Sequence, residues 1–327
     1  MLPASSGATD NLAGAHDPVA ARALRCWLTA CERFEDERLA GAAVMLRAAG
    51  RVVLTGAGVG LDAARFGALA LREAVFEAQA THAADLASGA FPLRPGDVVL
   101  GIDTGRRDLP AALTRARDLG LHTLGLTDRD LTLIDPDVLA HYVEPEGPPA
   151  PAGPSPLPVC AVLCMLVART EPSAALAFDA ATFQRQIEKL AAARDVAARF
   201  VDAVGDSPVR LWIAGAGPTT WIAASAARRI NRQQMGPPGL VAIAAHLSDL
   251  SEPDWPFQPT DAVITLEPAD AGTPVESANS APVTCWRIGG PRAGASLHTQ
   301  VHASSPALAS LGMSFVVEFL LDELASR

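Results

Sequence analysis

The sequence predicts an α/β protein made of two units, each a parallel β-sheet covered by helices on both faces. Continuously apolar segments of strand length alternate with amphipathic helical segments, a pattern typical of a parallel sheet buried on both sides. The order of these segments is repeated once along the 327 residues, a length that suits two domains of ordinary size. Apolar residues make up 49% and charged residues 19% of the chain, as in globular proteins.

The first half begins with a long helical pattern. Asp17 followed by Pro18 is a favourable helix start, and the residues before it are expected to form a flexible tail. After this helical stretch, which continues to residue 50, the sequence predicts a strand at 51–56, a helix at 61–80, a short connecting segment at 81–91, a strand at 97–103, a helix at 108–120 and a strand at 122–128. A Pro-rich segment then leads into an apolar helix at 157–168.

The second half repeats this order. A helical stretch at 177–204 precedes a strand at 209–215 and a glycine turn at 215–220. A helix at 221–234 follows, and a further strand lies within 244–268. We therefore expect a tail at 1–16, a first domain at 17–175 and a second domain at 176–327, each with its own leading helix.

Individual residues recur in step with the elements. Gly56-Ala57-Gly58 is followed 159 positions later by Gly215-Ala216-Gly217. His82, Asp85, Leu86 and Asp97 are matched 164 positions later by His246, Asp249, Leu250 and Asp261, and five residues inserted near 235–239 account for the difference. The pattern predicts an internal duplication. Two such units would form a crevice at the carboxyl ends of their strands, which is the expected ligand site.

Charge and cysteine content exclude several classes of function. The net charge is −10 and Lys and Arg form no block, so we expect neither nucleic acid nor a membrane as partner. The five cysteines form no CxxC or Cys/His ligand pattern, so we expect buried, reduced thiols and no metal. The N-terminus lacks the features of a signal peptide, and the longest apolar run, 157–168, is too short to span a bilayer; we expect a cytoplasmic protein.

A glycine turn between a strand and a helix is a common anion site. Gly56 and Gly58 allow close backbone approach, and the start of the following helix offers N–H groups and the positive end of its dipole. A tight turn without a ligand is the alternative interpretation. Neither copy has the third glycine of the GxGxxG pattern, which argues against a nicotinamide or flavin, and we expect no cofactor.

Four segments of the first half carry a family resemblance. They are "VVLTGAGVG" at the glycine turn, "LALREA" at 69–74, "VVLGIDTGRRDLPAAL" at the next strand and loop, and "HTLGLTDRD" at the strand after it. In this order they resemble the tandem sugar isomerase (SIS) family, which is similar to the isomerase half of glucosamine-6-phosphate synthase and to related phosphosugar isomerases and deaminases. The resemblance implies two flavodoxin-like αβα sandwiches, a phosphorylated or acidic sugar as ligand, and a homodimer.

The resemblance, together with the placement of the arginines, nominates two sets of ligand-binding residues. In the first half they are Gly56, Gly58, Val59, Asp103, Thr104, Gly105, Arg106 and Arg107, and in the second half Gly215, Gly217, Thr219, Thr220 and Arg232. The chain departs from the family pattern at several places. Ile102 stands where the phosphate loop has its first serine, Arg107 stands where it has a threonine, and the His-Gly-Pro motif of the amino-sugar isomerases is absent from both halves. The two arginines could replace the lost hydroxyl groups by bidentate binding, or serve only solubility.

Three residues are candidates for catalysis. Glu73 matches the position of the family's base, which would remove a proton next to a carbonyl group. His82 and His246 could open a sugar ring or transfer a proton. The alternatives are structural: Glu73 as a solvated helix residue paired with an Arg, and the repeated His-x-x-Asp-Leu motif as a cap of the adjacent turn.

Three functions remain open at this stage. The first is an enzyme that isomerises or deaminates a phosphorylated sugar or amino sugar through an enediol or enediolamine. The second is a sugar-phosphate sensor or regulatory subunit without turnover. The third is an enzyme of this fold adapted to another anionic sugar, with Arg106 and Arg107 binding the new group.

Overall fold

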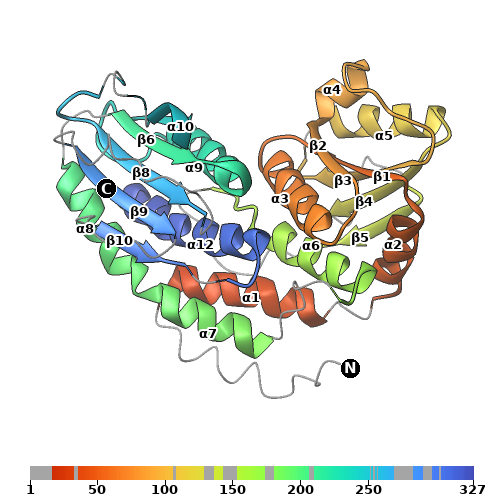
Figure 1. Cartoon of the computed structure of the whole chain (residues 1–327), viewed down its shortest axis with the longest axis horizontal. Helices are drawn as coiled ribbons and strands as arrows, with labels where there is room; N and C mark the ends of the chain where they lie inside the picture. Colours follow the sequence, from red (N-terminus) through yellow and green to blue (C-terminus); the bar gives the residue numbers. More distant parts are fainter. Residues whose placement is uncertain are drawn as a thin grey trace. The chain divides into compact units, whose positions relative to one another are not determined.

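The computed structural model describes residues 17–32, 36–105, 108–128, 136–142, 153–173, 180–205 (without the side chains of 180–184), 210–250, 252, 255, 257–268, 283–289, 297–301 and 303–327. The chain divides into two compact units, which are described separately. Unit 1 contains Ala21–Gly147 and Pro156–Gln184, and unit 2 contains Ala15–Ala20, Pro148–Ser155 and Arg185–Arg327. Each unit holds one parallel sheet with helices beside it (Figure 1).

Unit 1 alternates strands and helices. Its elements are α1 (Pro18–Glu32, whose first residues belong to unit 2), α2 (Glu37–Ala48), β1 (Arg51–Gly56), α3 (Val59–Glu73), β2 (Ala78–His82), α4 (Ala83–Ser88), β3 (Asp97–Asp103), α5 (Asp108–Asp118), β4 (His122–Thr127), β5 (Val138–His141) and α6 (Leu157–Thr170). The strands are all parallel, in the order β2-β1-β3-β4-β5. The strand order reverses between β1 and β3, whose connections leave toward opposite sides of the sheet.

The core of unit 1 lies on both faces of its sheet. On one face, Val53 and Val99 pack with the apolar side of α4 and α5, including Leu86, Leu109 and Leu113. On the other face, α3 packs against α6, and α6 against α2. Gly67 of α3 lets this helix approach Leu54 of β1 and Leu163 of α6, because a Cβ atom there would lie 2.6 Å from a methyl group of Leu54. Unit 1 is therefore a three-layer αβα sandwich.

Unit 2 has the same topology. Its elements are α7 (Ala180–Ala191, which begins in unit 1), α8 (Ala193–Val204), β6 (Arg210–Gly215), the 3₁₀ turn η2 (Gly217–Thr219), α9 (Thr220–Gln233), β7 (Val241–His246), α10 (Leu247–Leu250), β8 (Ala262–Glu267), β9 (Thr284–Gly289), β10 (Leu297–Gln300) and α12 (Pro306–Ala325). The order β7-β6-β8-β9-β10 repeats that of unit 1, and all pairs are parallel. The predicted fold, two flavodoxin-like sandwiches, is confirmed.

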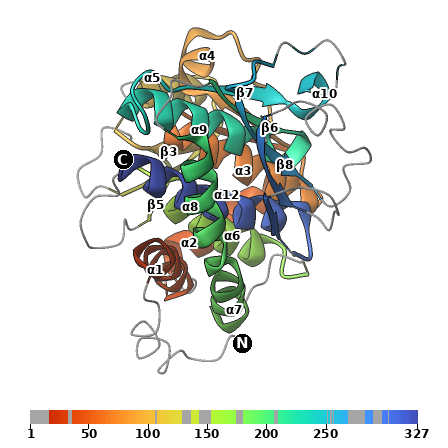
Figure 2. The same cartoon turned by 90° about the vertical axis from the view of Figure 1, so that its left-hand side faces the viewer.

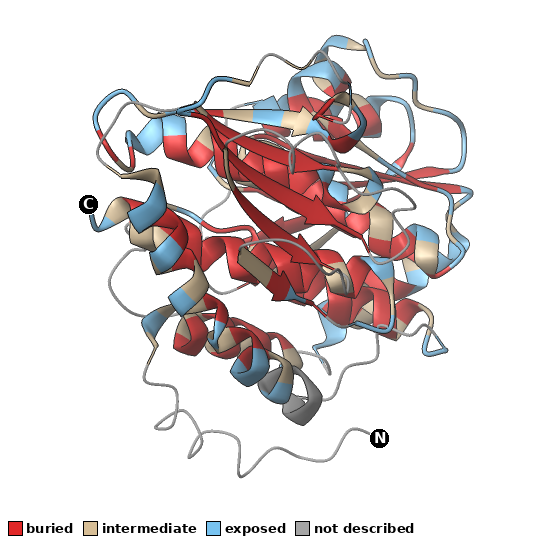
Figure 3. Cartoon of the chain, turned by 60° about the vertical axis from the view of Figure 1, so that its left-hand side comes forward, coloured by how far each residue is buried: buried red, intermediate tan, exposed pale blue. Residues whose placement is uncertain are grey.

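Helix α12 forms the centre of one face of unit 2. It packs against α8 and α9 (Figure 2), and most of its residues are buried. The strands β6 and β8 beside it are buried along nearly their whole length (Figure 3). The burial of α12 therefore comes from other elements of unit 2.

Several predicted boundaries differ from the structure. The helix expected at 61–80 ends at Glu73, and the last residues of that range belong to strand β2. The first helical stretch is divided into α1 and α2, and Asp36 caps the start of α2 by accepting the N–H of Arg38. Strands β5, β7 and β10 were not predicted. Like β2, they are edge strands with partly exposed residues, and they lack the continuous apolar run of a central strand.

Two further predictions concern the whole chain. All five cysteines are free; Cys26, Cys160, Cys164 and Cys285 are buried, as expected, whereas Cys31 is partly exposed. Burial raises the pKa of the Cys160 and Cys164 thiols well above the usual range, so both stay protonated. Within the described residues, none of the helices has the length and apolarity that crossing a membrane requires.

Candidate functional site

The candidate site of unit 1 lies at the carboxyl ends of β1 and β3. In open α/β sheets, ligands bind outside the carboxyl ends of the strands, at the point where the strand order reverses. Here that point brings together the glycine turn after β1 and the loop after β3, because the two strands are paired in register from Arg51–Asp97 to Thr55–Gly101. The segment with the phosphate-loop pattern therefore lies next to the glycine turn.

The glycine turn is shaped by close backbone packing. A Cβ atom on Gly56 would lie 2.6 Å from the carbonyl carbon of Gly60, so this position excludes a side chain. Gly58 has a φ of 58°, which favours glycine, and is the N-cap of α3. The N–H groups of Gly60 and Leu61 donate to carbonyl groups of the turn itself. Within the described part of the chain, the N–H groups of Gly58 and Val59, at the tip of the turn, donate to none of these carbonyl groups.

Thr104 joins the two loops of the site. Its hydroxyl donates to the carbonyl oxygen of Ala57 across 3.3 Å, and its side chain is partly exposed. The loop beyond it is held by Asp103, whose buried carboxylate accepts the N–H of Gly105 at 2.8 Å and the hydroxyl of Thr127 at 3.3 Å. Asp103 thus organises the loop, and its charge opposes an anion. Among the described residues of this loop, Thr104 is the one whose hydroxyl group contacts the glycine turn.

The described part of this site needs added positive charge to hold a dianion. Asp62, in the first turn of α3, is fully buried and, like Asp103, carries a carboxylate close to the turn. The helix dipole favours Asp62 at this end of α3 but gives only part of a unit charge to a ligand. Arg106 and Arg107, which the sequence nominates for this task, lie outside the described residues.

The corresponding turn of unit 2 is closed by its own threonine. Gly215 repeats the role of Gly56, since a Cβ atom would lie 2.7 Å from the carbonyl oxygen of Thr219, and Gly217 has a φ of 49°. Thr219 is 1% exposed, and its hydroxyl lies 2.9 Å from the carbonyl oxygen of Leu266. The hydroxyl of Thr220 donates to Gly217 at 3.0 Å. Both hydroxyl groups, which the sequence nominates for ligand binding, thus make hydrogen bonds to backbone carbonyl groups.

Both candidate histidines cap a helix. The Nδ1 atom of His82 accepts the N–H of Ala84 at 3.1 Å, and that of His246 accepts the N–H of Ser248 at 3.3 Å. Nδ1 of His82 is therefore an acceptor, which leaves Nε2 as the donor of the neutral ring, and Nδ1 of His246 also lies 2.7 Å from the Ser248 hydroxyl group. Both rings lie at the edge of the sheet that bears the glycine turns, because His82 pairs with Gly56 and His246 with Gly215. The geometry supports the structural alternative for both residues.

Two candidate residues, Glu73 and Arg232, lie at the C-terminal ends of α3 and α9 and are distant from the glycine turns. Glu73 is the last residue of α3, about 21 Å along the helix from Val59 at 1.5 Å per residue. The neighbouring Arg72 donates to Ala78 at the start of β2, which is the amino end of that strand. Within unit 1, Glu73 therefore lies far from Thr104, which is at the carboxyl edge. Arg232 lies in the last turn of α9 and is exposed, likewise distant from Gly217.

Sequence reasoning missed several residues that build the site. Thr127 and Tyr142 hold the strand end of the loop after β3: the Tyr142 hydroxyl donates to the carbonyl oxygen of Asp103 at 3.0 Å. Tyr142 is the one tyrosine of the chain and follows a strand, which is the signal that could have indicated it. Gly60 gave no signal, because its role appears only in the packing: a Cβ atom there would lie 2.9 Å from the carbonyl oxygen of Ile102.

Comparisons with known proteins agree with this fold. No model of a protein family matches the sequence, and no curated protein does. Among solved structures, the C-terminal domain of glucosamine-fructose-6-phosphate aminotransferase from Francisella tularensis has a TM-score of 0.70 at 10% identity, covering 94% of each chain. Tagatose-6-phosphate ketose/aldose isomerase from Escherichia coli has a TM-score of 0.70 at 14% identity, covering 96% of this chain and 94% of that one.

A third structure, glucosamine-6-phosphate deaminase from Thermotoga maritima, has a TM-score of 0.62 at 12% identity, covering 91% of this chain and 94% of that one. At these identities the similarity concerns the fold and not the ligand or the reaction. It extends over nearly the whole length of each chain, so both units are included. The chain has the fold of phosphosugar isomerase-type proteins across its two units.

Proposed function

We propose that this protein binds a phosphorylated or acidic sugar at the carboxyl ends of β1 and β3 in unit 1. The observation that carries the proposal is the Thr104–Ala57 hydrogen bond, which places a hydroxyl group between the two loops at the reversal of strand order. A ligand oxygen can accept the Thr104 proton in place of the Ala57 carbonyl. The names of the structures with the same fold, which are sugar-phosphate enzymes, support a ligand of this class.

The chemistry of the site divides the ligand into two parts. The N–H groups of Gly58 and Val59, the start of α3 and the Thr104 hydroxyl would hold anionic oxygens. Arg106 and Arg107 would supply the positive charge that offsets Asp62 and Asp103. The sugar hydroxyl groups would then lie toward the end of β2, where the Nε2–H group of His82 is a donor.

Isomerisation or deamination is the second candidate function, favoured by the reactions in the names of the structural neighbours. A base would remove the C2 proton of the open-chain sugar, and the enediol or enediolamine would take a proton back at C1. In deamination this gives an imine at C2, which water would hydrolyse to the ketone with release of ammonia. We retain Glu73 as the proposed base. Because Glu73 is distant from Thr104 within unit 1, this role requires a substrate held at the amino edge, or a second chain; the homodimer and the cytoplasmic location also stay predictions.

A ligand screen with the intact chain tests the first proposal. Thermal unfolding would be measured with hexose and pentose phosphates, amino-sugar phosphates and sugar acids, with the unphosphorylated sugars and inorganic phosphate as controls. Stabilisation grows as RT ln(1 + [L]/Kd), so a ligand at 100 times its Kd adds about 2.7 kcal/mol and raises the Tm by several degrees. Stabilisation by the free sugars alone, or by none of the compounds, would contradict the proposal.

Matched variants connect the result to the site. Thr104→Val keeps the shape of the side chain and removes the hydroxyl; we expect about tenfold weaker binding, whereas Thr114→Val on the exposed side of α5 should bind normally. For the second candidate, exchange of the C2 proton in D₂O would be followed by NMR. Glu73→Gln should abolish it and Glu77→Gln, an exposed neighbour, should not. Equal exchange in both variants would remove Glu73 from the mechanism.

A further inference from the structure

We infer that the two glycine turns are not equivalent ligand sites: Gly60 keeps the turn of unit 1 open, and Thr219 seals the turn of unit 2. The chain then binds one ligand of this class, in unit 1. The identity of the ligand rests on the proposed function, whereas the closure of the unit 2 turn rests on the hydrogen bonds of Thr219. Which of the two turns binds the ligand is thus determined by the residues at one pair of matched positions, Gly60 and Thr219.

The registers of the two sheets establish the match. Gly56 pairs with His82 and Thr55 with Gly101 in unit 1. Gly215 pairs with His246 and Ala214 with Thr265 in unit 2. The first strand and its helix are thus offset by 159 residues and the third strand by 164, so Gly60 corresponds to Thr219 and Ile102 to Leu266.

The Thr219 hydroxyl group is fully used by the backbone around it. It lies 2.9 Å from the carbonyl oxygen of Leu266 and 3.1 Å from that of Ala216, and it accepts the N–H of Ala216 at 3.0 Å. A threonine hydroxyl has one proton to donate, which these two carbonyl groups share, so none is left for a ligand. At 1% exposure the group is also out of reach. It fastens the turn after β6 to the end of β8 at the reversal of strand order.

In unit 1 the hydrogen bond between the two loops comes from Thr104, in the loop after β3. Gly60 has no side chain to place there, and the space is taken by Thr104, whose methyl and hydroxyl groups both lie 3.4 Å from where a Gly60 Cβ would be. The single bond from Thr104 to Ala57 is 3.3 Å long, and Thr104 is partly exposed. A ligand can replace this bond without opening the core, whereas in unit 2 it would have to displace a buried hydroxyl with three contacts.

The ligand test compares three forms of the full chain. Binding of fructose 6-phosphate, with glucosamine 6-phosphate and inorganic phosphate as further probes, would be measured by calorimetry for the wild type, Gly60→Thr and Thr219→Ala. We expect one site per chain, at least about tenfold weaker binding in Gly60→Thr, and unchanged affinity in Thr219→Ala. Two sites in the wild type, or loss of binding in Thr219→Ala with retention in Gly60→Thr, would overturn the inference.

A ligand-free measurement separates the inference from the proposed function. Amide hydrogen exchange at Ala216 should be slower in the wild type than in Thr219→Ala, by roughly fivefold or more, because the hydroxyl protects this N–H. Equal rates would show that the seal does not exist, whatever the ligand result. If no sugar phosphate binds the wild type, the proposed function fails and the exchange rates still decide on the seal. Should Gly60→Thr not fold, the number of sites in the wild type and the affinity of Thr219→Ala decide the ligand part of the inference.

Discussion

Val75 has the least favourable backbone conformation for its residue type among the described residues. It follows α3 with a φ of 67°, and its side chain is 92% exposed. The N–H of Val75 donates to Arg72 and that of Phe76 to Leu71, which is the hydrogen-bond pattern of a Schellman C-cap. Gln234 has a φ of 52° at the matching position of unit 2. A β-branched side chain in this conformation is strained, and its exposure offers no compensating burial.

Val75→Gly should therefore stabilise the protein. Glycine adopts the left-handed conformation without strain, and we expect the free energy of unfolding to rise by about 1 kcal/mol, measured by urea denaturation. Val44, also exposed but within α2, is the matched control: Val44→Gly should lower stability by about a few tenths of a kcal/mol, because glycine is less favourable than valine in a helix. Equal effects of the two substitutions would mean that the strain at Val75 is not real.

The two histidine caps give a prediction that separates structure from catalysis. Replacing an N-cap by alanine costs about 1 kcal/mol, so His82→Ala should lower stability by that amount, whereas His82→Asn, which keeps an acceptor, should restore most of it. The same pair of substitutions at His246 should behave alike. If His82→Asn is stable but has lost turnover of a sugar phosphate identified in the screen, the imidazole has a chemical role beyond the cap.

At the level of the elements, the same ion pair holds the amino edge of each sheet. Arg51 of β1 donates from Nε and Nη2 to both carboxylate oxygens of Asp97, at 3.0 and 2.6 Å. Arg210 of β6 makes the same two bonds to Asp261, at 2.9 and 2.7 Å. Each carboxylate also accepts an N–H from three residues earlier, from Arg94 and from Gln258. The pairs fix the first strand of each unit beside the third, and so align the loops of the site at the other edge.

The ion pair of unit 2 predicts how stability depends on pH. Burial alone would raise the pKa of Asp261, but the hydrogen bonds from Arg210, Gln258 and Trp212 together hold it below its usual value. A lowered pKa in the folded state adds stability above the unfolded pKa, near 3.9, and this contribution is lost as the pH falls further. Asp261→Asn should therefore cost roughly 2 kcal/mol at pH 7 and much less near pH 3.

Urea denaturation at the two pH values measures this difference. Asp118→Asn, an exposed residue in the last turn of α5, serves as the control and should change stability little at either pH. A cost of Asp261→Asn that is the same at pH 7 and pH 3 would show that the charge of the carboxylate is not what matters.

The elements also show which structural features could be predicted from sequence. Strands β1, β3, β4, β6 and β8 are nearly continuous apolar runs, because both faces of a central parallel strand are covered, and the sequence predicts all five. Strand β9 is as buried, but Arg287 in its middle interrupts the pattern, so it was missed. Edge strands such as β2 were missed because partial exposure removes the signal.

For the site, the sequence indicates the positions of the two glycine turns and of the loop with Thr104. It does not indicate whether a buried side chain closes either turn. The matched positions of Gly56 and Gly215 follow from spacing. That Thr219 is buried and fully hydrogen-bonded does not, because its partners, Leu266 and Ala216, are backbone groups that no side-chain pattern reveals. The distance of Glu73 from the loop could have been derived from helix length alone, since a 15-residue helix crosses from one edge of the sheet to the other.

On the scale of the whole molecule, the two units agree in strand order, in register and in the ion pair at the amino edge. A duplication followed by divergence of the ligand turns explains this agreement, and we retain it as a proposal. The crevice expected between the two halves stays a prediction as well. Divergence of Gly60 and Thr219 fits a chain in which one copy keeps a binding role and the other becomes a structural partner.

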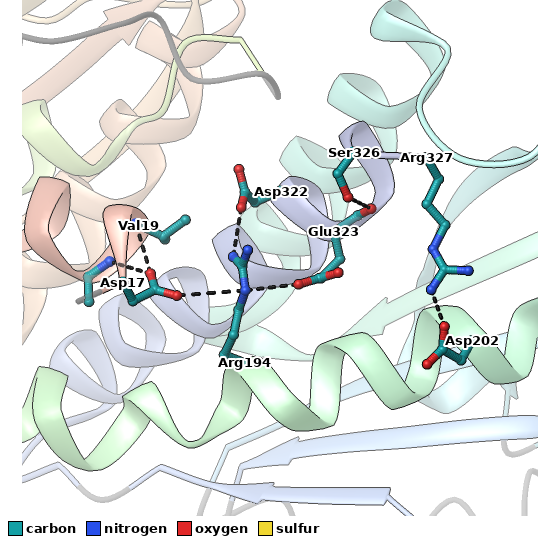
Figure 4. A network of polar contacts seen from close by, with 9 residues as sticks. Asp17, Val19, Arg194, Asp202, Asp322, Glu323, Ser326 and Arg327 are labelled. Atoms are coloured by element: carbon teal, nitrogen blue, oxygen red, sulfur yellow. Dashed lines mark hydrogen bonds and ion pairs between the residues drawn. The ribbon is translucent and has the colours of Figure 1, made fainter. Parts of the chain in front are cut away.

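Unit 2 joins segments from both ends of the chain through Arg194. This residue, at the start of α8, pairs with Asp322 at 2.7 Å, Glu323 at 2.9 Å and Asp17 at 3.6 Å (Figure 4). Asp17 also accepts the N–H of Val19 at 2.8 Å and so caps α1. One guanidinium thus faces three carboxylates, and removal of its charge leaves them to repel one another.

Arg194→Met should therefore destabilise the protein more than an isolated surface pair would. We expect a loss of about 1–2 kcal/mol, between the values for exposed and buried pairs, because the four side chains are each 17–28% exposed. Repulsion among the three acids is screened by salt, so the loss measured by urea denaturation should shrink in 1 M NaCl. Arg199→Met, on the exposed side of the same helix, should cost at most a few tenths of a kcal/mol. A loss at Arg194 that does not change with salt would point to its packing on the ring of Phe319, 5.9 Å away, as the main contribution instead.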